Sequence, residues 1–172
     1  MDCEAGTYSA SFLNDECLAC TAGYYCTGGT TKKYPGSLST HKGTICPAGH
    51  YCPQSSGAPQ ACPKGTYRAD TGATSVDDCI RCPDNTFSAE AGSTRCLGCG
   101  PDAKSQEGSF TCECVGQFRA FSPADSMCRC QPGYYFLKSD GTVGDRFGSS
   151  SFACTPISVA RCGSDQARTS TG

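Results

Sequence analysis

The chain has 172 residues, of which 17 are cysteine, and its formal net charge at pH 7 is −2. Leu, Ile, Val and Phe together number fewer than the 21 glycines, and tryptophan is absent, which excludes an ordinary hydrophobic core. With 14 Lys and Arg against 16 Asp and Glu, nucleic-acid binding is not indicated. No apolar stretch approaches the roughly 20 residues of a membrane-spanning helix, so no membrane insertion by this segment is expected.

The density of cysteine is the strongest single feature of the composition. One cysteine in about ten residues is typical of disulfide scaffolds, which persist in oxidising compartments. We therefore expect an extracellular or cell-surface protein that is secreted through the endoplasmic reticulum. The first cysteine motif begins at Cys3 without a leader before it, and the number of cysteines is odd, so we expect a segment of a longer chain that continues after Gly172.

One motif recurs six times: a cysteine is followed by Gly or Asn at the third position and by an aromatic residue at the fifth. The copies are CEAGTY from Cys3, CTAGYY from Cys20, CPAGHY from Cys46, CPKGTY from Cys62, CPDNTF from Cys82 and CQPGYY from Cys130. The third position is Gly6, Gly23, Gly49, Gly65, Asn85 or Gly133, and the fifth is Tyr8, Tyr25, Tyr51, Tyr67, Phe87 or Tyr135. Gly, and after it Asn, reaches positive φ most easily, so each copy predicts a tight turn. The ring should then lie over a disulfide and form a miniature core.

The cysteine spacing changes along the chain. Three repeats close with Cys-x-x-Cys, at Cys17 to Cys20, Cys79 to Cys82 and Cys96 to Cys99. The one-residue gaps at Cys112 to Cys114 and at Cys128 to Cys130 resemble those of epidermal-growth-factor-like (EGF-like) modules. A Gly/Ser-rich stretch, Ser139 to Phe152, then precedes Cys154 and Cys162, and a short strand is expected from Thr155 to Ala160.

These features predict a small disulfide-rich, elongated fold of tandem cysteine-rich modules, with short β-hairpins and much irregular loop. Four parts are expected. They are N-terminal cysteine-rich repeats at 1–61, two further repeats at 62–98, EGF-like modules at 99–138, and a Gly/Ser-rich segment with the start of a further unit at 139–172.

No residue pattern indicates a catalytic or cofactor-binding site, so an enzyme is not expected. Zinc binding at the Cys-x-x-Cys pairs, with His50 as a further ligand, is disfavoured because the flanking repeats share these cysteines. His41 and His50 are interpreted as surface residues. The acidic pairs Asp15-Glu16 and Asp77-Asp78 are interpreted as solvated turn carboxylates, because the dense Asp/Asn spacing of a calcium loop is absent. Without an N-glycosylation sequon around Asn14 or Asn85, any glycan is expected to be O-linked, for example near Thr30 or Ser149.

The motifs from Cys3 to Tyr135 resemble the ephrin-receptor-like cysteine-rich repeat, a relative of the growth-factor-receptor cysteine-rich modules. The most specific stretch is CIRCPDNTFSAEAGSTRCLGC from Cys79, followed by GSFTCEC. Such repeats occur in receptor ectodomains, in multi-repeat surface proteins and in mastigonemes, the hair-like filaments of algal flagella. The resemblance implies a kind of module and leaves its biological role open.

The family pattern also implies a set of disulfides. The implied pairs are Cys3 with Cys17, Cys62 with Cys79, Cys82 with Cys96, Cys99 with Cys112 and Cys114 with Cys128. Cys20, Cys26, Cys46 and Cys52 then pair among themselves in one of three ways. We further expect Cys130 to pair with Cys154, which leaves Cys162 unpaired within this segment.

Two functions are compatible with such repeats. The first is an extracellular structural module, a spacer or subunit of a surface filament or coat of the mastigoneme type. It would contact copies of itself or neighbouring extracellular proteins. The alternative is the stalk or ligand-binding ectodomain of a cell-surface receptor or adhesion protein.

Overall fold

The computed structural model describes residues 3–10, 16–136 and 154–156. In these residues the secondary structure consists almost entirely of short antiparallel hairpins, each a separate two-stranded sheet. The pairs are β1 (Thr7–Tyr8) with β2 (Leu18–Ala19), β3 (Tyr24–Cys26) with β4 (Gly43–Ile45), β5 (His50–Tyr51) with β6 (Gln60–Ala61), β7 (Thr66–Tyr67) with β8 (Ile80–Arg81), β9 (Thr86–Phe87) with β10 (Leu97–Gly98), β11 (Ala103–Lys104) with β12 (Glu113–Cys114), β13 (Arg119–Ser122) with β14 (Met127–Cys130), and β15 (Tyr134–Phe136) with β16 (Cys154–Pro156). The helical elements are α1 (Leu38–His41) and the 3-10 turn η1 (Val76–Asp78). The predicted class, a small disulfide-rich protein of tandem modules with short hairpins and much loop, is confirmed.

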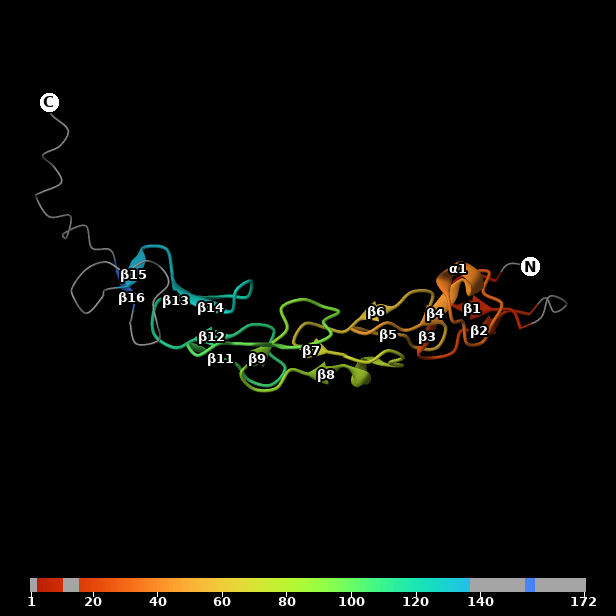
Figure 1. The fold of residues 1–172 in the computed structure, drawn as a ribbon, viewed down its shortest axis with the longest axis horizontal. Coiled ribbons are helices and arrows are strands. Elements are labelled where there is room, and N and C mark those ends of the chain that lie inside the picture. The colour runs from red at the N-terminus through yellow and green to blue at the C-terminus, as the bar shows by residue number, and fades with distance from the viewer. Residues whose placement is uncertain (1–2, 11–15, 137–153, 157–172) are drawn as a thin grey trace, which may run out of the picture. The chain divides into compact units, whose positions relative to one another are not determined.

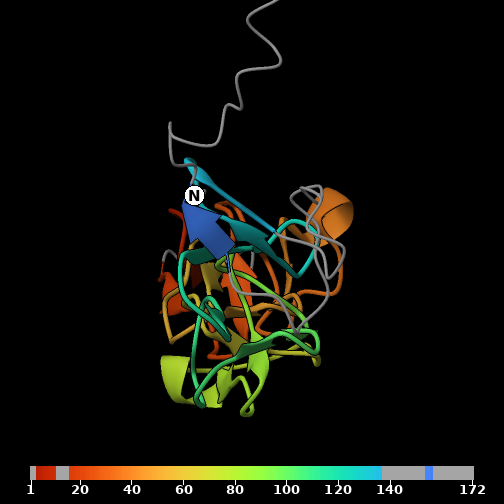
Figure 2. The ribbon, with the colours of Figure 1, turned by 90° about the vertical axis from the view of Figure 1, so that its left-hand side faces the viewer.

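The chain divides into two compact units. Unit 1 consists of residues 1–98 and 105–112, and unit 2 of residues 99–104 and 113–172. Within unit 1 the hairpins follow one another in chain order from β1 to β9 (Figure 1). In unit 2 the blue strand β16 pairs with the cyan strand β15 (Figure 2). The strand expected from Thr155 to Ala160 thus begins one residue early, at Cys154, and its residues beyond Pro156 lie outside the described part of the chain.

Cysteine provides most of the buried apolar surface. Thirteen of the eighteen buried hydrophobic residues in the described ranges are cysteines, and the others are Tyr8, Ala73, Phe87, Ala103 and Phe136. Two buried clusters illustrate the arrangement, one made of Tyr8 with Cys20 and Cys26, the other of Phe136 with Cys130 and Cys154. In each cluster one buried ring and one partly buried ring, Tyr24 or Tyr134, pack on a cross-link, and such small clusters take the place of a common hydrophobic core.

The structure contains the disulfides Cys3–Cys17, Cys20–Cys26, Cys46–Cys52, Cys62–Cys79, Cys82–Cys96, Cys114–Cys128 and Cys130–Cys154. Cys99 and Cys112 are also both disulfide-bonded. Of the three pairings left open for Cys20, Cys26, Cys46 and Cys52, the structure has the one with two bridges of sequence separation 6. Cys162 lies outside the described residues.

Two kinds of module result from these bridges. In the modules opened by Cys3, Cys62 and Cys82, the bridge spans 14 to 17 residues and joins the opening cysteine to the residue just before the second strand of the hairpin. In the modules opened by Cys20 and Cys46, the bridge closes only the turn and the first strand. In the chain-entropy model, loops of about 15 residues gain about 3 kcal/mol from a bridge, and shorter loops gain less.

Candidate functional site

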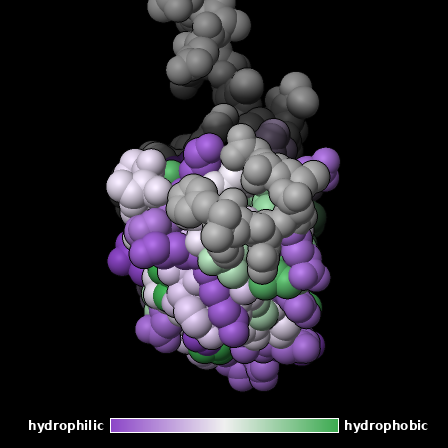
Figure 3. Space-filling model, turned by 90° about the vertical axis from the view of Figure 1, so that its right-hand side faces the viewer, coloured by the Kyte–Doolittle hydropathy of each residue, from purple (hydrophilic) through white to green (hydrophobic). Residues whose placement is uncertain are grey.

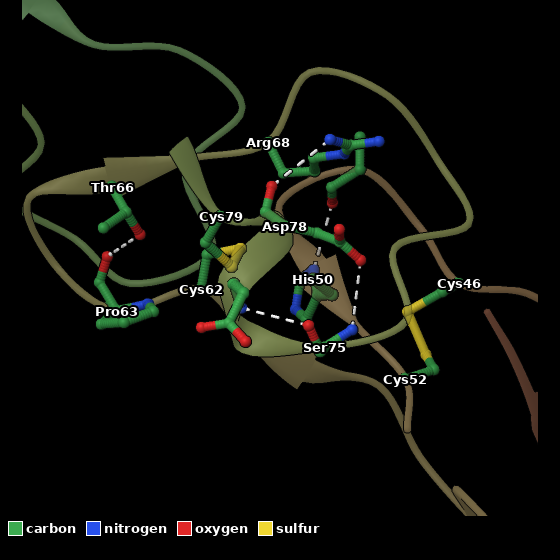
Figure 4. Close-up of a disulfide and its surroundings, with 12 residues drawn as sticks. Cys46, His50, Cys52, Cys62, Pro63, Thr66, Arg68, Ser75, Asp78 and Cys79 are labelled. Carbon is green, nitrogen blue, oxygen red and sulfur yellow. Dashed lines mark hydrogen bonds between the residues drawn. A yellow bond between two sulfur atoms is a disulfide. The ribbon is translucent and has the colours of Figure 1, made fainter. Parts of the chain in front are cut away.

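The six copies of the repeated motif form turns with the same backbone geometry. At all six motif positions the third residue has positive φ, from 62° at Asn85 to 89° at Gly6. In each turn the backbone amide of the fourth residue after the cysteine donates to the carbonyl of the first residue after the cysteine. An example is Thr66 N to Pro63 O at 3.1 Å. The hydroxyl of Thr66 donates to the same carbonyl at 2.6 Å (Figure 4). These bonds and the positive φ at Gly65 are the features of a type II turn.

The turn residue bonds to the following module through both of its backbone groups. Its carbonyl accepts from the amide of the next opening cysteine, as in Cys82 N to Gly65 O at 2.9 Å. Its amide donates to the carbonyl six residues beyond that cysteine, as in Gly65 N to Ser88 O at 2.9 Å. The amide bonds recur in five successive steps, namely Gly6 to Cys26, Gly23 to Cys52, Gly49 to Arg68, Gly65 to Ser88 and Asn85 to Ser105. We call this repeated set of bonds the backbone ladder.

A second series of positive-φ residues completes the ladder, and the sequence analysis did not identify it. Its members are Gly29, Ser55, Gly72, Gly92 and Gly108. Each donates its amide to the carbonyl of the cysteine that opens the preceding module, as in Gly108 N to Cys82 O at 2.8 Å. Its members lie nine or ten residues after the opening cysteine of their module, and one of them is serine, so a motif with one fixed spacing and glycine does not include them all.

The two series meet between modules that are not sequence neighbours. A Cβ on Gly23 would lie 2.8 Å from the carbonyl oxygen of Gly72. Equivalent overlaps would occur between Gly6 and Ser55, Gly49 and Gly92, and Gly65 and Gly108. The modules opened by Cys3, Cys20, Cys46 and Cys62 therefore each contact the next module by hydrogen bonds and the one after it by close backbone approach.

Only two of the six expected aromatic rings are buried as miniature cores. Tyr8 is buried against Cys20 and Cys26 of the following module, and Phe87 is fully buried. Tyr25, Tyr51, Tyr67 and Tyr135 are half-buried.

The last motif corrects the ring expected at Tyr135. There Phe136, not Tyr135, packs on the Cys130–Cys154 bridge. Phe136 is paired with Cys154 across the hairpin, and alternate residues of a strand face opposite sides, so Tyr135 points away from that bridge.

Asp78 has a structural role that the sequence interpretation did not include. Its Oδ2 accepts from Thr74 N at 2.7 Å, Thr74 Oγ1 at 3.0 Å and Ser75 N at 3.2 Å. It thereby forms a capping box with Ser75 at the start of η1, next to the Cys62–Cys79 bridge (Figure 4). The backbone amide of Thr74, then that of Ser75, lowers the pKa of the Asp78 carboxyl, because these bonds stabilise its ionised form. Asp77 and Glu16 are exposed, whereas Asp15 lies outside the described residues.

The two histidines are not brought together with any catalytic partner by the described contacts. Nδ1 of His50 lies 3.1 Å from the carbonyl oxygen of Ala48 within the same turn, and Nδ1 of His41 lies 3.3 Å from the hydroxyl of Thr40. Both side chains are partly exposed. In the described ranges no three His, Cys, Asp or Glu side chains group so as to hold a metal ion.

In the stretch around Thr30, where an O-linked glycan is expected, Thr30 itself is buried. Thr30 is only 1% exposed, and its hydroxyl donates to the carbonyl of Lys42 at 2.6 Å. The hydroxyl is therefore inaccessible, whereas the neighbouring Thr31 is exposed. Ser149 lies outside the described residues.

In the described part of unit 2, Arg119 and Asp102 form a buried ion pair. Nη2 of Arg119 lies 3.4 Å from Oδ2 of Asp102, and its Nη1 donates to the carbonyl of Val115 at 2.7 Å. The guanidinium carbon lies 5.7 Å from the ring centre of Phe136. The Arg119 side chain is 1% exposed and that of Asp102 is 17% exposed, so this charge pair is part of the packing and not an open site.

Comparison with known proteins gives partial matches. No protein-family model matches the chain. A rat protein named "Sushi, von Willebrand factor type A, EGF and pentraxin domain-containing protein 1" is 28% identical over 170 residues, which cover 86% of this chain and 4% of that protein. The mouse protein of the same name gives the same values. A zebrafish protein named "Signal peptide, CUB and EGF-like domain-containing protein 2" is 33% identical over 102 residues, 58% of this chain and 9% of that protein.

The chain thus spans less than a tenth of the length of each of these relatives. It is similar to segments of proteins whose names record EGF-like domains and, in one case, a signal peptide. Together with the disulfides, this similarity identifies a disulfide-rich extracellular module. No helix in the described residues is both long and apolar enough to cross a membrane.

Proposed function

We propose that this chain is a structural, non-catalytic module of an extracellular assembly, a spacer or subunit of a surface filament or coat of the mastigoneme type. The observation that carries the proposal is the backbone ladder, which repeats the same inter-module bonds from Gly6 to Ser105. Such a ladder uses backbone groups and cysteines, so it leaves outward-facing side chains free to differ between modules. Adding a module adds the same bonds again, which is how repeat proteins gain length.

The repeats are proposed to be of the ephrin-receptor-like kind. The turns with positive φ, the hairpin disulfides and the Cys-x-x-Cys junctions support this assignment. The proposed partners are copies of the chain itself or neighbouring extracellular proteins, with O-linked glycans on exposed hydroxyls such as that of Thr31.

A second candidate is the stalk or ligand-binding ectodomain of a receptor or adhesion protein. Its support is the similarity to short segments of long proteins that are named for several different domains. In that case the modules would position a neighbouring binding domain, and filament formation would not be required.

Immunogold electron microscopy of the cells that make the protein separates these functions. Antibodies raised against the 172-residue chain should label extracellular filaments or a coat, at intervals along their length. Label distributed over the plasma membrane without filaments would favour the receptor stalk. Label confined to the cell interior would contradict both candidates.

A further inference from the structure

The charges of unit 1 are segregated along the chain. From residue 17 to residue 69 there are five Lys or Arg and no Asp or Glu. From residue 70 to residue 98 there are five Asp or Glu and only two Arg. The near balance of the whole chain therefore conceals a basic segment and an acidic segment within one compact unit.

The basic segment contains an enlarged loop. The module opened by Cys20 extends 26 residues before the next opening cysteine, whereas the other repeats from Cys3 to Cys99 extend 16 to 20. We call residues 27–42, which hold the additional length, the lysine loop. It exposes Lys32, Lys33 and Lys42.

The lysine loop is held in place by its own contacts. The carbonyl of Lys42 accepts from the amide of Thr27 at 2.8 Å and from the hydroxyls of Thr27 and Thr30 at 2.8 and 2.6 Å. The Tyr34 ring meets Tyr24 edge to face at 5.5 Å, and Nζ of Lys33 lies 5.3 Å from the centre of the same ring. Tyr34 nevertheless remains 57% exposed. The loop thus presents an ordered aromatic and cationic surface to the outside.

The acidic segment supplies a surface of opposite charge. Asp70, Asp77 and Asp84 are exposed, while Asp78 is used in its cap and Glu90 faces Lys64 at 3.9 Å. Within the described residues no ion pair joins Lys32, Lys33 or Lys42 to a carboxylate, or Asp70, Asp77 or Asp84 to a cation. These six charges are therefore available to a second molecule.

We propose that the lysine loop of one copy docks on the acidic segment 70–98 of a second copy, in a head-to-tail contact. This inference rests on the proposed function, because it names the contact by which copies assemble. The two surfaces differ, so the contact is heterologous and leaves one surface of each kind open at the ends, as filament growth requires.

The face turned to the viewer in Figure 3 is largely hydrophilic, with small separate apolar patches. A contact stabilised mainly by opposite charges fits such a surface better than one stabilised mainly by the burial of apolar side chains.

A charge-exchange experiment on the 172-residue chain tests the contact. One variant carries Lys32→Glu and Lys33→Glu, and the other carries Asp70→Lys and Asp84→Lys. Sedimentation velocity should show self-association of the unmodified chain at about 20 mM salt that is at least about tenfold weaker at about 500 mM. Each variant alone should associate at least about tenfold more weakly than the unmodified chain, because its two surfaces then carry the same sign. An equimolar mixture should regain association, because the unreversed lysine loop of one variant meets the unreversed acidic segment of the other, and the two reversed surfaces are again opposite in charge.

The matched control reverses one exposed cation outside residues 27–42 and 70–98, Lys104→Glu, and is compared with the single reversal Lys32→Glu. The two single reversals have the same net charge, but Lys104→Glu should associate like the unmodified chain, whereas Lys32→Glu should associate more weakly. A monomer at low salt, association that does not depend on salt, or a mixture that fails to regain association would overturn the contact. Binding to dextran sulfate without self-association would replace it with a polyanion site. Any of these results together with gold-labelled filaments would remove the contact and leave the proposed structural role intact.

Discussion

The carbonyl oxygen of Gly108 lies so close to Gly65 that it leaves no room for a Cβ there. A whole module, opened by Cys82, lies between these two glycines in the sequence. Gly65 also has a φ of +80°. The position therefore carries two separate constraints, of which asparagine meets only the conformational one.

Replacing Gly65 with Asn should destabilise the chain although Asn tolerates positive φ. The added Cβ forces the Gly108 segment away and strains the ladder at that step, so the free energy of unfolding should fall by about 2 kcal/mol or more. Denaturant unfolding with the disulfides intact measures this. Asn85→Gly and Lys64→Val, in equivalent or adjacent turn positions, should each change it by less than about 1 kcal/mol. Equal effects at Gly65 and Lys64 would remove the case for close packing.

The short bridges Cys20–Cys26 and Cys46–Cys52 should be found in the native protein. Peptide mapping without reduction should release each pair within one short peptide. The long bridges Cys62–Cys79 and Cys82–Cys96 should link peptides from opposite ends of a hairpin. A bond from Cys79 to Cys82, or from Cys20 to Cys46, would show that the modules have been divided wrongly.

Asp78 should make the η1 turn depend on pH in the acidic range. Its pKa is lowered in the folded state, so the stabilisation is complete above the ordinary carboxyl pKa and is lost as the pH falls through the lowered value. The protection of the Thr74 and Ser75 amides, measured by NMR as exchange relative to the intrinsic rate at each pH, should fall between about pH 5 and pH 2. Asp78→Asn should remove most of this pH dependence, whereas Asp77→Asn should leave it. A flat profile in the unmodified chain would contradict the assigned hydrogen bonds.

In unit 2, Asp102→Ala should be costly because it leaves the Arg119 guanidinium buried without its carboxylate. We expect a loss of about 2–4 kcal/mol in the free energy of unfolding. The control is Asp125→Ala, which removes the partner of Arg129 from a half-exposed pair and should cost less than about 1 kcal/mol. Similar losses in both variants would show that the Arg119 pair is not buried in solution.

The sequence predicted the elements that depend on local residue types. Gly65 and Asn85 both have positive φ because a tight turn restricts that position to these residue types. The hairpins were predicted with these turns, and in the module opened by Cys62 the bridge to Cys79 ties the turn before the first strand to the start of the second strand. Composition alone also indicated that cysteines would replace an apolar core, as the burial of Cys62 and Cys82 illustrates.

Other features depend on contacts between modules and were missed for that reason. Gly92 and Gly108 occupy equivalent ladder positions, but they lie ten and nine residues after their opening cysteines, so a motif with one fixed spacing does not join them. The choice of Phe136 over Tyr135 as the buried ring depends on which strand face meets Cys154. The burial of Thr30 follows from how the lysine loop closes, which cannot be read from residue types.

Small-angle X-ray scattering tests the central claim, that tandem modules without a common core form a structural spacer. In about 500 mM salt, where the charged contact is screened, the monomer should have a radius of gyration of about 25–35 Å. That value lies between the roughly 16 Å of a compact domain of this length and the roughly 44 Å of an unfolded chain. Reduction of the disulfides should raise it toward the unfolded value. A native radius near roughly 16 Å that survives reduction would contradict the account, because it would require a compact core that the sequence and the disulfide-linked modules do not supply.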